Sequence, residues 1–281
     1  MTRLFGSAYT TDYLMEKCFP DQKNIRQNVH CEIRSMENAR SFWSMIGRLQ
    51  LKWKDEEDSD LPSSLFIKVP CVTDNSVASD QESEMESLQQ TLVNLTKKEE
   101  QFYRALNNVI VPGFPYPRYY YGEEVNEIPG LPGCLILEDF SGKVTASDYI
   151  PGFTIQQVEA LMCSLASWHA FIFKDKSNMY DESVKLEDYF PERLRGRISP
   201  LGAYFTQEHT FDSIRSYKDL GIPPVLVHMD MNTTNVLWKE GTSSTEPQIA
   251  AVIDFQNVHM GNLCEDMARI LQLAVSVETR R

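Results

Sequence analysis

The chain has 281 residues, of which 42% are hydrophobic and 24% are charged, a composition typical of folded globular proteins rather than disordered chains. Its formal net charge of -13 at pH 7 argues against nucleic acid or an anionic membrane as the main partner, because both would repel an acidic protein at long range. The six cysteines form no C-x-x-C pair, and no stretch reaches the ~18 apolar residues of a membrane span, so we expect a cytoplasmic protein with reduced thiols.

The first 110 residues predict a small sheet with helices. Residues 9–18 have the spacing of a short helix, and residues 31–51 are typical of extended segments joined by a turn. Residues 49–54 and 64–70 predict two strands of a hairpin with a polar, acidic loop between them. The polar stretch 72–87 then predicts a loop, which leads into a helix over residues 89–110.

The rest of the chain changes from short extended segments to longer helical patterns. Prolines at 112–117 end the preceding helix, residues 118–122 begin an extended segment, and residues 131–140 predict a buried strand followed by two carboxylates. Residues 154–174 predict a long helix with one apolar face. Residues 225–255 predict two apolar strands around a turn, with polar residues gathered just outside the strands.

These polar residues form the chemically most informative pattern. His228, Asp230 and Asn235 match H-x-D-x-x-x-x-N, and Asp254 follows Asn235 by nineteen residues. Phosphoryl transfer needs a carboxylate that acts on the acceptor hydroxyl, and oxygen ligands for the cations that neutralise nucleotide phosphates. The pattern therefore indicates a phosphotransferase in which Asp230 is the catalytic residue, and Asn235 and Asp254 bind Mg²⁺.

Several segments carry a resemblance to a known family. The loop pattern, the runs VIDFQ, HMGNLCEDMARIL and LILEDF, and the E-x-x-F-Y pattern at residues 99–103 are similar to the choline kinase and aminoglycoside phosphotransferase group of the protein-kinase-like superfamily. Within this group the chain most resembles the ecdysteroid-kinase-like, or CHK kinase-like, branch and its nematode members. The resemblance covers residues 35–281 and is strongest from residue 225. It implies an α+β, bilobal protein-kinase-like fold, with a small β-sheet lobe and a larger, mainly helical lobe.

The resemblance also implies where ATP and Mg²⁺ would bind. Residues 1–140 would form the nucleotide-binding lobe, in which Lys68 resembles the strand lysine that pairs with phosphates and Glu99 resembles the helix glutamate that holds it. The hinge would lie at about 136–141, where the backbone around Glu138 and Phe140 would pair with adenine. Residues 141–281 would form the helical lobe with the catalytic and metal loops.

The chain departs from the family pattern in two places. Residues 38–44, which should cover the phosphates, contain no glycine, although close backbone approach to phosphate usually requires one. We therefore expect weaker nucleotide binding. Family members continue with further helices beyond the position of Arg281, so the helical lobe is expected to be truncated here.

Some of these residues have a structural interpretation beside the functional one. His228 is expected to support the loop by hydrogen bonds, and Asp266 to stabilise the N-terminal end of a helix. Lys68 has the alternative of an edge-strand surface lysine. Glu100 is as good a partner for Lys68 as Glu99, so the sequence does not decide between them.

The function that these patterns predict is ATP-dependent phosphorylation of a small-molecule hydroxyl, with a choline-, sterol- or aminoglycoside-like acceptor. The alternative is a catalytically inactive kinase-like binding protein, which the glycine-free segment favours. A protein kinase fits less well, because no A-P-E anchor or long activation segment follows Asp254.

Overall fold

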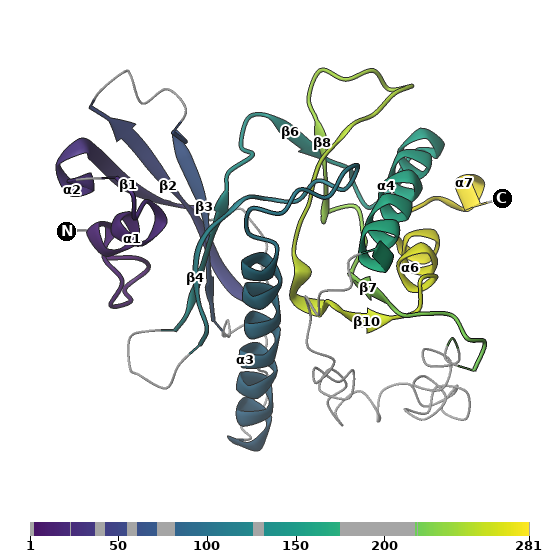
Figure 1. The fold of residues 1–281 in the computed structure, drawn as a ribbon, viewed down its shortest axis with the longest axis horizontal. Coiled ribbons are helices and arrows are strands. Elements are labelled where there is room, and N and C mark those ends of the chain that lie inside the picture. The colour runs from purple at the N-terminus through teal and green to yellow at the C-terminus, as the bar shows by residue number, and fades with distance from the viewer. Residues whose placement is uncertain are drawn as a thin grey trace. The chain divides into compact units, whose positions relative to one another are not determined.

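The computed structural model describes residues 3–22, 24–36, 43–54, 61–71, 82–125, 132–174, 217 and 219–280. Its contacts divide the chain into two compact units (Figure 1). Unit 1 comprises Met1–Asn108 and Pro117–Ser141, and unit 2 comprises Val109–Tyr116 and Gly142–Arg281. In the described ranges we find no helix with the length and apolar character that crossing a membrane requires.

Unit 1 is built on a five-stranded antiparallel sheet with the order β1-β2-β3-β5-β4. The strands are β1 (Val29–Ser35), β2 (Ser44–Trp53), β3 (Ser64–Pro70), β4 (Tyr119–Glu123) and β5 (Cys134–Glu138). The predicted hairpin is confirmed, since β2 and β3 pair directly. Lys68 lies opposite Ile46 of β2 and Leu135 of β5. It therefore sits on a strand with neighbours on both sides, and the edge-strand interpretation of Lys68 is wrong.

The helices of unit 1 are α1 (Thr11–Cys18), α2 (Ile25–Asn28) and α3 (Glu82–Ala105). The predicted short helix is confirmed as α1, which Thr10 caps by accepting a hydrogen bond from the backbone N–H of Tyr13. Leu14 and Met15 of α1 join buried residues of the sheet in one hydrophobic core. Figure 1 shows the longer helix α3 running beside β4.

Helix α3 differs from the prediction at both ends. It already begins at Glu82, so the predicted loop is wrong from residue 82 to residue 87. Its first turns contain Glu and Met, which favour helix without producing an apolar stripe, and this explains why the periodicity did not reveal them. The helix ends at Ala105, and the left-handed backbone of Asn108 (φ 63°) prevents it from continuing to residue 110.

Unit 2 combines helices with two small sheets. The predicted long helix is confirmed as α4 (Ile155–Lys174), and α6 (Glu265–Leu273) and α7 (Val277–Arg280) lie near the C-terminus. Strands β7 (Val225–Val227) and β10 (His259–Gly261) pair with each other. Strands β6 (Val144–Ala146), β8 (Val236–Lys239) and β9 (Ile249–Val252) form a three-stranded antiparallel sheet. The loops after β7 and β9 carry the predicted catalytic and metal residues.

The segment Val109–Tyr116 completes the core of unit 2. Phe114 stacks on Trp168 of α4, with ring centroids 4.8 Å apart. The carbonyl of Pro115 accepts a hydrogen bond of 2.9 Å from the backbone N–H of Val252 in β9. Trp168 in turn donates from Nε1 to the carbonyl of Leu226 in β7, at 2.6 Å. These contacts tie α4 to the strands that lead into the two loops.

Candidate active site

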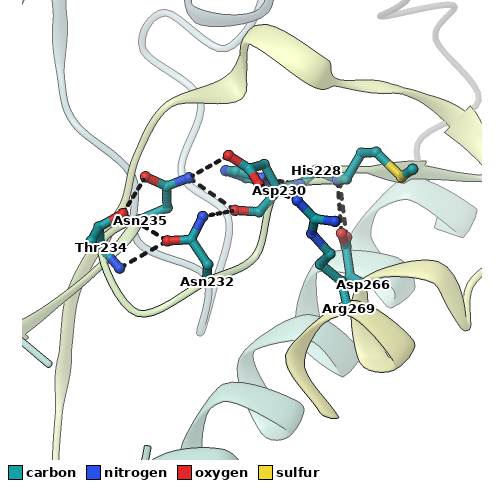
Figure 2. Close-up of polar contacts among 8 residues, drawn as sticks. His228, Asp230, Asn232, Thr234, Asn235, Asp266 and Arg269 are labelled. Carbon is teal, nitrogen blue, oxygen red and sulfur yellow. Dashed lines mark hydrogen bonds and ion pairs between the residues drawn. The ribbon is translucent and has the colours of Figure 1, made fainter. Parts of the chain in front are cut away.

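The loop between β7 and β8 holds Asp230 and Asn235 in direct contact. The amide Nδ2 of Asn235 donates to the carboxylate Oδ2 of Asp230 at 3.1 Å and to the backbone carbonyl of Asp230 at 2.9 Å. Asn232 donates to the same carbonyl at 3.2 Å (Figure 2). The oxygen of Asn232 accepts from the backbone N–H and the hydroxyl of Thr234, at 2.9 and 2.7 Å. The loop is thus closed by its own side chains, which orient the Asp230 carboxylate.

His228 has the structural role that we expected from the sequence. Its Nδ1 accepts a hydrogen bond of 3.2 Å from the backbone N–H of Asp230. Since Nδ1 is the acceptor, the ring proton lies on Nε2, which donates to the carbonyl of Ile253 at 2.8 Å. The ring also packs on Phe255, with centroids 4.6 Å apart. His228 therefore links the Asp230 loop to the segment that carries Asp254.

Asp254 follows β9, and the residue before it, Ile253, is hydrogen-bonded to the loop between β7 and β8. The backbone N–H of Ile253 donates to the carbonyl of Asn235 at 3.0 Å. Asp254 itself has a left-handed backbone (φ 68°) and precedes the short helix η5 (Phe255–Asn257). A positive φ is uncommon for a residue other than glycine and often marks a functional site. The segment that carries Asp254 is thus hydrogen-bonded to the loop that carries Asn235.

Asp266 makes contacts beyond the helix end at which the sequence placed it. It lies in the first turn of α6, but its carboxylate accepts hydrogen bonds from the backbone N–H groups of His228 and Met229, at 2.9 and 2.8 Å (Figure 2). Its side chain is buried. Burial raises the pKa of the Asp266 carboxyl group, and His228 with the two backbone hydrogen bonds lowers it in part. The predicted position at the start of a helix is confirmed, and Asp266 also fastens the loop between β7 and β8 to α6.

Arg269 belongs to the site although the sequence did not point to it. Its Nη2 donates to Oδ1 of Asp230 at 2.8 Å, and the two side chains are 37% and 22% exposed. Arg269 lies thirty-nine residues after Asp230. Its position one helical turn after Asp266 becomes informative once the contact between Asp266 and the loop is known, because residues three apart share a helix face.

In unit 1, the predicted phosphate lysine Lys68 forms an ion pair with Glu99. Nζ of Lys68 lies 2.7 Å from Oε2 of Glu99, and both side chains are largely buried. Glu100 instead accepts from the hydroxyl of Tyr119 at 2.9 Å and pairs with Arg104 at 3.2 Å. The choice that the sequence left open between the two glutamates therefore goes to Glu99 as the partner of Lys68.

The predicted hinge residues lie at and just beyond the end of β5, also in unit 1. The backbone N–H of Glu138 donates to the backbone carbonyl of Arg118 at 2.9 Å, and the carboxylate of Glu138 accepts from the backbone N–H of Arg118 at 3.2 Å. Phe140 is half-buried. Between them, the buried Asp139 accepts from Ser64 Oγ at 2.6 Å and pairs with Arg48 Nε at 3.2 Å. Residues 37–42, which include most of the predicted phosphate-covering segment, lie outside the described residues.

Comparison with known proteins finds relatives in Caenorhabditis elegans. The chain is 33% identical over 289 residues to the "Uncharacterized kinase-like protein D1044.1", and the match covers 95% of this chain and 74% of that protein. It is 24% identical over 287 residues to the "Uncharacterized oxidoreductase dhs-27", with coverage of 92% of this chain and 34% of that protein. A family model described as "DUF1679: Uncharacterized oxidoreductase dhs-27" matches residues 172–281.

A similar fold occurs in the solved structure of an ethanolamine kinase from Plasmodium vivax. The TM-score is 0.52 at 15% sequence identity, and the alignment covers 95% of this chain and 70% of the kinase. At this identity the likeness concerns the fold. The α+β, protein-kinase-like fold predicted from the sequence is confirmed.

Proposed function

Because the chain belongs to the family of the kinase-like protein D1044.1, we propose that it transfers the γ-phosphoryl group of ATP to a hydroxyl group of a small molecule. The observation that carries this proposal is the contact between Asp230 and Asn235. In the pattern H-x-D-x-x-x-x-N, the carboxylate and the amide lie 3.1 Å apart on a loop that His228 and Asp266 hold in place. A carboxylate so oriented is suited to accept a proton from an acceptor hydroxyl.

The residues around this contact fit a divalent cation. The Nδ2 group of Asn235 is used on Asp230, which leaves the amide oxygen Oδ1 as the acceptor atom of that side chain. Asp254, the second predicted ligand, directly follows Ile253, whose backbone N–H donates to the carbonyl of Asn235. The described residues contain no cluster of three or more His, Cys, Asp or Glu that would hold a metal ion by itself. Mg²⁺ usually takes one or two protein oxygen ligands and completes its shell with water and substrate phosphates.

The proposed reaction assigns each group one task. Asp230 accepts the proton of the acceptor hydroxyl, whose oxygen forms the new bond to the γ-phosphorus while the bond from that phosphorus to the bridging β–γ oxygen breaks, and ADP leaves. Asn235 and Asp254 would hold Mg²⁺, which neutralises charge on the phosphates. Lys68, held by Glu99, would pair with the α- and β-phosphates.

The finer assignments are part of the same proposal. We place the chain in the ecdysteroid-kinase-like or choline kinase-like branch, with a choline-, sterol- or aminoglycoside-like acceptor, on the motifs described above. We place the reaction in the cytoplasm, which the six cysteines support, since all of them are described and all are free thiols.

Binding and turnover of MgATP test the proposal. We expect millimolar MgATP to raise the melting temperature, because a ligand that binds only the folded state stabilises it. We also expect labelled phosphate to pass from ATP to an acceptor in a metabolite extract. Asp230→Asn should lower kcat by about 10²–10⁴-fold, the usual contribution of a general base, with KM for ATP little changed.

The matched control is Asp148→Asn, which removes an exposed carboxylate of the same unit and should leave kcat unchanged. Equal turnover of Asp230→Asn and the wild-type protein would refute the role of Asp230. Stabilisation by MgATP without any transfer or hydrolysis would instead establish the inactive kinase-like binding protein. If MgATP gave neither stabilisation nor turnover, both functions would be wrong.

A further inference from the structure

Helix α6 contacts the catalytic loop with two side chains of opposite charge. Asp266 binds the backbone N–H groups of His228 and Met229, and Arg269 binds the carboxylate of Asp230 (Figure 2). The two residues are one turn apart, so both reach the loop from the same face of the helix. The first contact fixes the path of the backbone, whereas the second acts on the side chain to which we assign the chemistry.

The two oxygens of the Asp230 carboxylate are held by different partners. Nη2 of Arg269 donates to Oδ1 at 2.8 Å, and Nδ2 of Asn235 donates to Oδ2 at 3.1 Å. An ionised carboxylate can accept about four hydrogen bonds, so each oxygen keeps a lone pair for a further donor. Held on both oxygens, the carboxylate cannot rotate about its bond to Cβ without losing one of the two contacts.

Only part of the guanidinium group of Arg269 is hydrogen-bonded in the described residues. Its Nε is buried and has no hydrogen-bond partner within the described part of the chain. An unpaired buried N–H is unfavourable to stability. The interaction of Arg269 with the loop therefore rests on the hydrogen bond from Nη2 to Asp230 and not on Nε.

We propose that Arg269 is a positioning residue of this phosphotransferase, whose guanidinium group holds the Asp230 carboxylate in the orientation that accepts the acceptor's proton. The inference rests on the proposed function. Arg269 touches neither the reacting atoms nor the nucleotide in this assignment, and it acts through Asp230. Two other roles for the contact give different results in the experiment below: a purely structural contact, and a latch that blocks Asp230.

The experiment measures release of labelled phosphate from [γ-³²P]ATP with Mg²⁺, with water as the acceptor, so that the natural acceptor need not be known. Arg269→Gln removes the positive charge and keeps a long polar side chain. We expect kcat to fall by about 10–100-fold, because small misplacements of a catalytic group have effects of this size, while KM for ATP stays within about twofold. Arg269→Lys keeps the positive charge but lacks the planar guanidinium group, and its kcat should fall less than that of Arg269→Gln.

Arg280→Gln is the matched control. Arg280 lies on α7 and donates to the backbone carbonyls of Gln272 and Val275. Because these contacts are remote from the loop between β7 and β8, the same substitution there should leave kcat unchanged. Melting temperatures of all variants show which of them fold. If Arg269→Gln does not fold, Arg269→Lys carries the comparison with the wild-type protein and Arg280→Gln.

The deciding variant combines Arg269→Gln with Asp230→Asn. A residue that acts through Asp230 should lower the residual rate no further in the Asp230→Asn background. An equal fold-loss in both backgrounds would mean a structural role and would overturn the inference. A rise in kcat for Arg269→Gln would mean a latch, and wild-type turnover in either Arg269 variant would also overturn it. No turnover by the wild-type protein would instead overturn the proposed function, and this inference with it.

Discussion

Lys68 and Glu99 join two elements of unit 1 through a single ion pair. Lys68 projects from β3 in the middle of the sheet, and Glu99 meets it from α3 at 2.7 Å. A lysine held by a buried glutamate has its ammonium group fixed in place rather than free to sample many rotamers. This is the arrangement that a phosphate-binding lysine of a kinase-like fold requires.

Removal of this lysine tests its role in nucleotide binding. Lys68→Ala should raise KM for MgATP by about tenfold or more, since a charge-assisted hydrogen bond contributes about 1.5–3 kcal/mol. Glu99→Gln should also raise KM for MgATP, by a smaller factor. Steady-state kinetics over a range of ATP concentrations would measure both.

Two control variants belong with this pair. Lys52→Ala removes an exposed lysine from the neighbouring strand β2, and Glu100→Gln changes the adjacent glutamate, which contacts Tyr119 and Arg104 instead. Neither should change KM. A KM for Lys68→Ala equal to that of Lys52→Ala would exclude Lys68 from the nucleotide site.

The sequence predicted residues whose chemistry is visible in a local pattern, and missed those whose role depends on folding. Asp230, Asn235 and Asp254 could be proposed because their spacing implies a loop between two strands. Arg269 could not, because nothing in its own segment shows which loop the polar face of α6 meets. For the same reason the sequence placed Asp266 correctly at a helix end but did not reveal its hydrogen bonds to His228 and Met229.

At the scale of elements, the position of α6 depends on a close approach between two backbones. Gly152 has a left-handed conformation (φ 87°), and a Cβ atom there would lie 2.5 Å from the carbonyl oxygen of Ala274, just beyond the end of α6. That carbonyl cannot move aside freely, because it accepts a hydrogen bond of 2.7 Å from the backbone N–H of Phe153. Glycine is therefore required here for both conformation and space.

Two glycine substitutions separate these two requirements. Gly142 also has a positive φ (69°), but a Cβ atom there would meet nothing within 4 Å. Gly142→Ala should cost about 1–2 kcal/mol in the free energy of unfolding, the usual penalty for a left-handed alanine. Gly152→Ala should cost a further ~1–3 kcal/mol, because the new atom overlaps the backbone.

Urea denaturation of both variants would measure the difference. Since Gly152→Ala should also displace the end of α6, it should lower kcat, whereas Gly142→Ala should not. Equal free energies of unfolding for the two variants would show that the contact at Ala274 relaxes without cost.

Elements with a strong period were predicted well, including the ends of α4 and β3, whereas the ends of α3 were not. Helix α4 and the hairpin of β2 and β3 follow directly from their apolar patterns. The start of α3 could not be predicted from an apolar pattern, because Glu and Met favour helix by intrinsic propensity and their spacing here is not periodic in hydrophobicity. The strand position of Lys68 was also undetermined, since the order of strands in a sheet depends on pairings that are distant in sequence.

At the scale of the whole molecule, two buried or half-buried carboxylates make stability depend on pH. Burial alone would raise the pKa of Glu123, but hydroxyl hydrogen bonds from Tyr121, Tyr13 and Tyr9, together with Lys17, hold its pKa below the ordinary value of 4.5. For Asp139 too, burial acts to raise the pKa, and hydrogen bonds from Ser141 and Ser64 with the charge of Arg48 hold its pKa below 3.8. Both groups favour the ionised form in the folded state.

The sign of the effect follows from these lowered pKa values. A carboxylate whose pKa is lower in the folded state stabilises the fold above its unfolded pKa, and this contribution is lost as the pH falls. The contribution of these two groups to the free energy of unfolding should therefore decrease below about pH 4.5. Glu123→Gln should be less stable than the wild-type protein at pH 7 and should lose less on acidification.

Urea denaturation at pH 7 and pH 4 measures this difference. The control is Glu159→Gln, at an exposed position of α4, which should keep the pH dependence of the wild-type protein. If Glu123→Gln and Glu159→Gln lost the same free energy between the two pH values, the tyrosine hydrogen bonds to Glu123 would have no part in acid sensitivity.

The segment Val109–Tyr116 also constrains how such a protein can be rearranged in evolution or in the laboratory. The chain passes between the two units three times, after Asn108, after Tyr116 and after Ser141. A single recombination point near Ser141 would transfer α4 and the loop between β7 and β8 without the segment Val109–Tyr116. Phe114 of this segment packs on Trp168, and the carbonyl of Pro115 accepts a hydrogen bond from Val252. An exchange of one unit between two such proteins would therefore need several recombination points.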